Sequence, residues 1–185
     1  LNEEKKSSLL KSMKYGIFSG GKRFRATILV NTGRIFKIDY KTLITVGAVV
    51  ECIHSYSLIH DDLPSMDNDD FRRGKPSTHR MFNEAQAILA GDSLHDLAFE
   101  ILSNKKTHPN SKIRIVLVNL LSNCLGSNGL AGGQSLDLLY ESKNVSLKKI
   151  EKMYKMKTGQ LFKFCCAGPF IMNRSSKKEI NFASN

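Results

Sequence analysis

The residues most able to do chemistry lie in the segment from His54 to Arg80. It places five aspartates within ten residues of a chain whose formal net charge is +11. They are Asp61, Asp62, Asp67, Asp69 and Asp70. Two carboxylates about 5 Å apart repel by roughly 3 kcal/mol at an effective dielectric constant near 20. Such a cluster requires cations, and carboxylate oxygens without a nearby cysteine favour a hard ion such as Mg²⁺.

Residues 42–60, in front of the aspartates, read as an apolar helix. Pro64 disfavours helical geometry at Leu63, so this helix is expected to end near Asp62. Asp61 and Asp62 would then lie at a helix C-terminus, where the macrodipole disfavours negative charge. Three cationic residues follow closely: Arg72, Arg73 and Lys75. The alternative, a solvated acidic turn followed by a basic one, explains neither the apolar helix nor the adjacent arginines. We interpret the stretch as a site for metal and phosphate.

A second cluster of cations follows the glycine pair Gly20-Gly21, at the expected start of a helix. Backbone N–H groups at a helix N-terminus combine with Lys and Arg side chains into an anion site. Lys22 and Arg25 lie three residues apart and are expected to share a helix face, whereas Arg23 points elsewhere. Taken alone, the same residues also fit a helix C-cap followed by a solvated helix start.

Two later clusters combine glycine with polar residues inside apolar helices. Gln134 and Asp137 follow a glycine pair, which fits close helix packing as well as binding. Lys157 and Thr158 precede Gly159 in mid-helix, where a glycine costs about 1 kcal/mol relative to alanine. That glycine suggests a bend or a close approach, or is simply tolerated. Together, the clusters indicate two diphosphate sites, one acting through metal and one through cations alone.

Apolar residues recur at helical spacing over most of the chain, and alternating β-branched residues are scarce. Helices are expected over residues 3–18, 22–36, 40–62, 77–89, 93–103, 110–125, 129–140 and 146–167. Ser77 or Thr78 would cap the fourth, Ser146 would cap the last, and Gly91-Asp92 would separate the fourth from the fifth. The predicted fold class is all-α, a single-domain helical bundle with short connections.

Composition limits the classes of function. The 28 Lys and Arg against 17 Asp and Glu would suit nucleic acid, an anionic membrane or small polyanions. No nucleic-acid-binding motif accompanies this charge, so a nucleic-acid partner is not expected. Apolar runs such as residues 43–53 are too short to span a bilayer, and the first residues do not resemble a secretory signal. The four cysteines lack metal-ligand spacing. We therefore expect a cytoplasmic protein with reduced thiols and no membrane insertion.

Five motifs, in this order, resemble those of the trans-isoprenyl diphosphate synthases, and most of all the bacterial farnesyl diphosphate synthase group. They are GGKRFR, HSYSLIHDDLPSMDNDDFRRG, AILAGDSLHDLAFEIL, GGQSLDL and KMKTGQL. The resemblance covers the chain from about Lys14 to Gly168. It implies an isoprenoid-synthase-type helical bundle around a central cavity, and a homodimer. The implied reaction is the head-to-tail 1′-4 condensation of isopentenyl diphosphate with dimethylallyl or geranyl diphosphate. The products are farnesyl diphosphate and pyrophosphate.

The resemblance also implies a role for each matching residue. Asp61 and Asp67 would bind Mg²⁺, with Asp62 supporting them. The allylic diphosphate would contact Arg72, Lys157 and Thr158. The diphosphate of isopentenyl diphosphate would be held by Lys22, Arg25, His54 and Arg73. The implied catalytic set is Asp61, Asp62, Asp67, Arg72 and Lys157.

Product length in this family is set just before the aspartate pair, here by Tyr56 and Ser57. Tyr56 and the two-residue insertion in DDLPSMD resemble the farnesyl-producing bacterial pattern, although Ser57 faces the pocket more squarely on an ideal helix. The family also has a second aspartate-rich motif, but no aspartate follows Asp137. The expectation is one polyprenyl synthase domain over residues 1–185 that lacks the C-terminal helices with that motif. A geranylgeranyl diphosphate synthase and a non-catalytic subunit or fragment of a heteromeric prenyl synthase stay open.

Overall fold

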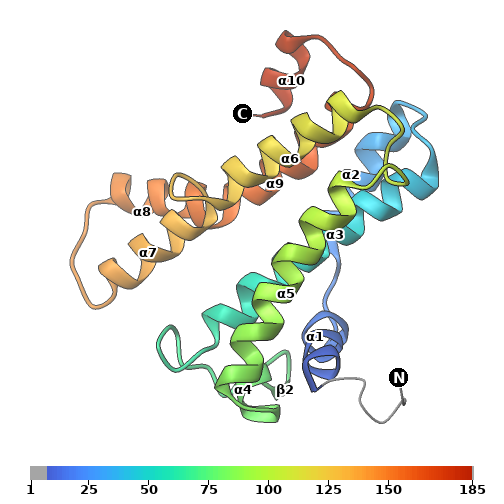
Figure 1. The fold of residues 1–185 in the computed structure, drawn as a ribbon. Coiled ribbons are helices and arrows are strands. Elements are labelled where there is room, and N and C mark those ends of the chain that lie inside the picture. The colour runs from blue at the N-terminus through green and yellow to red at the C-terminus, as the bar shows by residue number, and fades with distance from the viewer. Residues whose placement is uncertain (1–7, 185) are drawn as a thin grey trace, which may run out of the picture. The chain divides into compact units, whose positions relative to one another are not determined.

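The structure, a computed structural model, describes residues 8–184, and most of them lie in helices (Figure 1). The α-helices are α1 Ser8–Phe18, α2 Phe24–Ile35, α3 Tyr40–Asp61, α4 Thr78–Met81, α5 Glu84–Ser103, α6 Ser111–Leu125, α7 Leu130–Tyr140, α8 Leu147–Tyr154, α9 Gln160–Met172 and α10 Lys177–Ala183. A π-helical turn, η2 Lys155–Gly159, joins α8 to α9, and two short strands, β1 Phe71–Arg72 and β2 Lys75–Pro76, form a hairpin. The all-α prediction is confirmed.

Several predicted boundaries agree with the structure to within a residue, among them both ends of α3, α6 and α7. The predicted first helix began at residue 3, and residues 3–7 lie outside the described part of the chain. Two elements were not predicted, the hairpin and α10. The sequence does contain a signal for α10. Ser176 and Glu179 form a capping box, in which Ser176 Oγ accepts from the Glu179 amide.

The predicted helix break at Gly91-Asp92 is wrong, because α5 runs unbroken through both residues. The chain breaks earlier, before Asn83, whose side chain accepts a 2.8 Å hydrogen bond from the Gln86 amide. Gly91 has a packing role instead. A Cβ atom there would lie 3.0 Å or less from the His60 ring of α3. The close approach of α3 to α5 explains a glycine inside a helix.

The predicted start of the second helix at Lys22 is also wrong, since α2 begins at Phe24. Gly20, Gly21 and Arg23 have φ values of +103°, +117° and +52°, which are incompatible with a right-handed helix. Lys22 therefore lies in the irregular segment before α2 rather than on a helix. The expectation that Lys22 and Arg25 share a helix face fails for that reason.

The chain divides into two compact units. The first comprises Leu1–Arg23 and Ala48–Ile101. Its core is built from α3 and α5, where apolar residues recur every three or four positions. These are Val49, Val50 and Ile53 of α3 with Ala87, Ala90, Leu94 and Ala98 of α5. The aspartate-rich segment and the hairpin both belong to this unit.

The second unit comprises Phe24–Gly47 and Leu102–Asn185. In it α9 packs against α2 and α6, and α7 packs against η2. The buried side chains include Leu29 of α2, Leu117 and Leu121 of α6, and Phe164 of α9. Burying one such side chain contributes about 1.5–3 kcal/mol.

By length and composition, α3 could cross a membrane, as could the helical stretch Ser111–Tyr140. In the structure 56% of the apolar window of α3 is buried, as expected for the core helix of a bundle. The second stretch is interrupted between Leu125 and Leu130, where α6 ends and α7 begins. The expected absence of membrane insertion stays a prediction.

Candidate functional site

The loop after α3 returns to the end of that helix. The Met66 amide donates to the Leu63 carbonyl at 2.8 Å, and the Asn68 amide donates to the same carbonyl at 3.1 Å. Between these two bonds the Asp67 amide donates to the Asp61 carbonyl at 2.9 Å. Asp61 and Asp67, six positions apart in sequence, are therefore neighbours through their backbones.

This pair of aspartates fits a hard divalent cation. Asp61 is half-buried at the end of α3, and Asp67 is exposed on the loop. Over residues 8–184, no group of three or more His, Cys, Asp or Glu side chains is arranged to hold a metal. Mg²⁺ keeps several waters and is bound through one or two carboxylates together with substrate phosphates. Asp61 and Asp67, which are backbone neighbours, can supply two such carboxylates.

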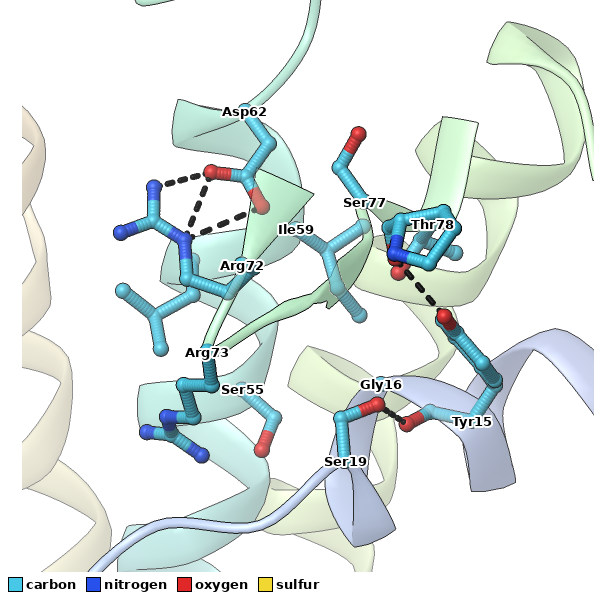
Figure 2. Close-up of a pocket in the computed structure, with 12 residues that line it drawn as sticks. Tyr15, Gly16, Ser19, Ser55, Ile59, Asp62, Arg72, Arg73, Ser77 and Thr78 are labelled. Carbon is cyan, nitrogen blue, oxygen red and sulfur yellow. Dashed lines mark hydrogen bonds and ion pairs between the residues drawn. The ribbon is translucent and has the colours of Figure 1, made fainter. Parts of the chain in front are cut away.

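Asp62 has a different environment from its neighbour Asp61. Only 2% of it is exposed, and Arg72 Nε donates to its two carboxylate oxygens at 2.9 and 3.2 Å (Figure 2). Arg72 Nη2 also donates to Asp62 Oδ1, and at 2.9 Å to Asp69 Oδ2. Burial raises the pKa of Asp62 above its ordinary value against the lowering effect of these hydrogen bonds, and Asp62 raises the pKa of Arg72. Asp62 thus supports the site by holding Arg72.

The two adjacent arginines point to different partners because Arg72 ends strand β1 and Arg73 begins the hairpin turn. β1 and β2 pair antiparallel, with Arg72 opposite Lys75. The turn residues Arg73 and Gly74 have φ values of +55° and +75°, the combination that a type I′ turn requires. Arg72 extends to Asp62, whereas Arg73 donates to the Gly20 carbonyl. The sequence signal for this turn was the glycine after the arginine pair.

The cations after the glycine pair have separate surroundings. Arg23 forms a 2.6 Å ion pair with Glu51 and donates to the Ile17 carbonyl, which confirms that it points away from Lys22. Lys22 is exposed. Arg25 belongs to the second unit, where its guanidinium carbon lies 4.7 Å from the centre of the Phe162 ring. At that distance a cation–π attraction holds the side chain.

A pocket in the first unit lies between α1, the end of α3, the hairpin and the start of α4 (Figure 2). Of the predicted site residues, Asp62, Arg72 and Arg73 line it. Sequence reasoning missed the other lining residues, which are Tyr15, Gly16, Ser19, Ser55, Leu58, Ile59, Pro76, Ser77 and Thr78. Tyr15 Oη donates to the Pro76 carbonyl at 2.7 Å and fastens α1 to the hairpin. Ser77 precedes α4 as predicted, but its hydroxyl contacts His79 rather than capping the helix.

In the second unit, Lys157 and Thr158 lie in the π-helical turn η2. Lys157 Nζ donates to Asp137 Oδ2 of α7. A Cβ atom on Gly133 would lie 2.5 Å from Lys157 Cα, so the backbones of α7 and η2 touch there. A Cβ atom on Gly159 would meet only the Tyr154 carbonyl at 3.9 Å. Close packing therefore explains Gly133, and Gly159 is simply tolerated.

The two residues predicted to set product length differ in their packing. The Tyr56 ring contacts the rings of His60 and His95 edge to face, with centroids 5.1 and 5.2 Å away. Ser57 is buried, and its hydroxyl donates to the His54 carbonyl of its own helix at 3.0 Å. Tyr56 therefore spans from α3 to α5, whereas Ser57 is engaged within α3.

Known proteins resemble the chain along its whole described length. The family model of polyprenyl synthetases matches residues 6–185. A farnesyl diphosphate synthase of Buchnera aphidicola from Acyrthosiphon pisum is 47% identical over 181 residues, which are 97% of this chain and 60% of that protein. The Escherichia coli farnesyl diphosphate synthase is 47% identical over 156 residues, 84% of this chain and 52% of that protein. The chain thus spans about 60% or less of the length of these two relatives.

Solved structures agree. An apo crystal structure of a Zymomonas mobilis FPP/GFPP synthase superposes with a TM-score of 0.92 at 44% identity, covering 95% of this chain and 64% of that one. A geranyltranstransferase from Thermotoga maritima superposes with a TM-score of 0.80 at 38% identity, covering 95% and 63% respectively.

Proposed function

The chain belongs to the polyprenyl synthetase family. From that premise we propose that it acts as a farnesyl diphosphate synthase. The proposed reaction joins isopentenyl diphosphate to dimethylallyl or geranyl diphosphate and releases pyrophosphate. One observation carries the proposal: the hydrogen bond from the Asp67 amide to the Asp61 carbonyl, which makes backbone neighbours of two aspartates that flank an insertion.

In this proposal Asp61 and Asp67 would hold Mg²⁺. The metal ion would neutralise the charge that develops on the departing pyrophosphate. Arg72, oriented by Asp62, contributes a fixed positive charge to the same group. Ionisation leaves an allylic carbocation, and the double bond of isopentenyl diphosphate attacks it. Loss of a proton then gives a chain five carbons longer. No protein nucleophile is needed, and apolar helix walls exclude water that would quench the cation.

The second diphosphate is proposed to bind through cations alone. The family resemblance assigns Lys22, Arg25, His54 and Arg73 to isopentenyl diphosphate. Lys157 and Thr158 are assigned to the allylic diphosphate together with Arg72.

Tyr56 is proposed to limit product length, because its aromatic packing against α5 holds a rigid side chain five residues before Asp61. We further propose that the protein works as a cytoplasmic homodimer, without a nucleic-acid partner and without membrane insertion.

The proposal is tested by measuring pyrophosphate release and product length with the purified chain, Mg²⁺, isopentenyl diphosphate and geranyl diphosphate. We expect a fifteen-carbon product, and a loss of at least about a hundredfold in kcat for Asp61→Ala. Asp70→Ala is the matched control: it removes the same charge from the same cluster at an exposed residue that pairs with Arg80. It should retain turnover.

Other outcomes separate the alternatives. A twenty-carbon product would favour a geranylgeranyl diphosphate synthase. Diphosphate binding that depends on Mg²⁺ but comes without turnover would favour a non-catalytic subunit. A chain that neither binds diphosphate nor turns over would contradict the proposal.

A further inference from the structure

Arg73 is held at its backbone by the hairpin turn and at its tip by the glycine pair after α1. Its guanidinium donates to the Gly20 carbonyl. It also lies directly over the α-carbon of Gly21. A Cβ atom on Gly21 would lie 2.7 Å from the guanidinium carbon, closer than real Cβ atoms approach other heavy atoms.

The two glycines have similar backbones but different surroundings. Gly20 has a φ of +103° and Gly21 a φ of +117°, a region that residues with a Cβ atom rarely adopt. A Cβ atom on Gly20, however, would have no heavy atom within 4 Å. The backbone conformation therefore explains both glycines, whereas only Gly21 also leaves space for another side chain.

This contact joins two segments that are more than fifty residues apart in sequence. The glycine pair precedes Lys22 directly, and Arg73 lies at the tip of the hairpin. The Arg73 side chain is exposed, and a long exposed cation otherwise samples many rotamers. The contacts of the Arg73 guanidinium with the Gly21 α-carbon and the Gly20 carbonyl restrict those rotamers before an anion binds. A side chain that is already ordered loses less entropy on binding, which favours binding of the anion.

We infer that Gly21 is a positioning residue: by lacking a side chain, it seats Arg73 beside Lys22 as part of one diphosphate-binding surface. This inference rests on the proposed function, because it assigns Arg73 and Lys22 to the diphosphate of isopentenyl diphosphate. Arg73 touches that group, and Gly21 acts through Arg73.

The test compares Gly21→Ala with Gly20→Ala in the purified chain, with inorganic pyrophosphate as the probe in titration calorimetry. Both variants place alanine at positive φ, so both bear the backbone strain, but only Gly21→Ala also displaces Arg73. We expect Gly21→Ala to weaken pyrophosphate binding about tenfold more than Gly20→Ala, the scale of one hydrogen bond to a charged group. In turnover, the KM for isopentenyl diphosphate should rise while the KM for the allylic diphosphate changes little.

A double-mutant cycle separates positioning from a general loss of structure. In the Arg73→Ala background no guanidinium lies against Gly21. Gly21→Ala should therefore weaken pyrophosphate binding no further than Gly20→Ala does. Equal affinities for the two glycine variants in the parent background would overturn the inference, as would an undiminished effect of Gly21→Ala without Arg73.

The same data distinguish failure of the inference from failure of the proposed function. If Arg73→Ala leaves pyrophosphate affinity unchanged, the assignment of Arg73 to a diphosphate is wrong, and the inference falls with it. If Arg73→Ala weakens binding but the two glycine variants have equal affinities for pyrophosphate, only the positioning role of Gly21 is wrong.

Discussion

The five aspartates, which composition alone presents as one repulsive cluster, do three different things. Asp61 and Asp67 are joined through the loop backbone, and Asp62 and Asp69 share Arg72. Asp70 pairs with Arg80 at the surface, where hydrogen bonding by the guanidinium lowers the pKa of Asp70. Cationic side chains thus pair with three of the five carboxylates, those of Asp62, Asp69 and Asp70.

Asp62→Asn should separate the support of Arg72 from the stability of the fold. Asparagine keeps the shape and one acceptor oxygen but removes the charge that holds Arg72, so we expect the KM for the allylic diphosphate to rise about tenfold. Urea unfolding should still show a folded protein, because the Arg72 side chain is 31% exposed and keeps its ion pair with Asp69.

The matched control is Asp69→Asn. It removes the charge from the acceptor of a single hydrogen bond, at a side chain that is 49% exposed, where ion pairs contribute little. Equal KM increases for the two variants would show that Asp62 has no special role in holding Arg72.

At the scale of elements, glycines set how closely two helices approach. Gly91 lets the His60 ring of α3 lie against α5, and Gly133 lets the backbone of α7 touch η2 at Lys157. The π-helical turn lies where that contact occurs, so the irregular backbone and the lysine pairing with Asp137 belong to one arrangement. Irregular helical turns of this kind are frequent at functional sites.

Gly133→Ala and Gly159→Ala should therefore have opposite effects on stability. A Cβ atom on Gly133 would collide with backbone atoms, so we expect the free energy of unfolding to fall by about 1–3 kcal/mol, as for other overpacked sites. Gly159 has a helical φ of −63° and open surroundings, so alanine should raise the free energy of unfolding by up to about 1 kcal/mol.

Urea denaturation of both variants provides the measurement. A Gly133→Ala protein as stable as the parent chain would rule out the backbone contact between α7 and η2.

At the scale of the molecule, each unit has its own apolar core. Both cores contain buried cysteines, whose reactivity shows whether the core is formed. Cys52 belongs to the first unit, and Cys124, Cys165 and Cys166 belong to the second. The first three are buried and Cys166 is half-buried. Burial raises the pKa of Cys52 and of Cys124 to about 11. Thiols with such a pKa are only ~0.1% thiolate at pH 8, and the thiolate is the reactive form.

Thiol labelling at pH 8 should consequently find one accessible cysteine in the native chain. Cys166 is expected to react first, and the other three only when the protein opens or unfolds. In urea all four should react, and Cys166→Ser should abolish the early reaction. Rapid labelling of Cys52 would show that the core of the first unit is not formed.

The features predicted from the sequence are those that neighbouring residues encode. Pro64 ends α3, helical periodicity marks α6 and α7, and the aspartate-rich segment with its arginine pair indicates a metal and phosphate site. Motif order was sufficient to identify the family. The helix boundaries rest on local backbone preference and the family on short motifs in their order, which is why the sequence alone determined them. The metal and phosphate site stays a prediction.

The arrangement of partners was decided by tertiary structure. Which carboxylate holds Arg72, why Arg73 lies over Gly21, and why Gly91 does not break α5 all depend on residues distant along the chain. The same glycine-rich pattern fits a helix cap, a turn or a close contact. Tertiary packing decides between a cap, a turn and a close contact, because only the folded backbone determines which side chain packs against the glycine.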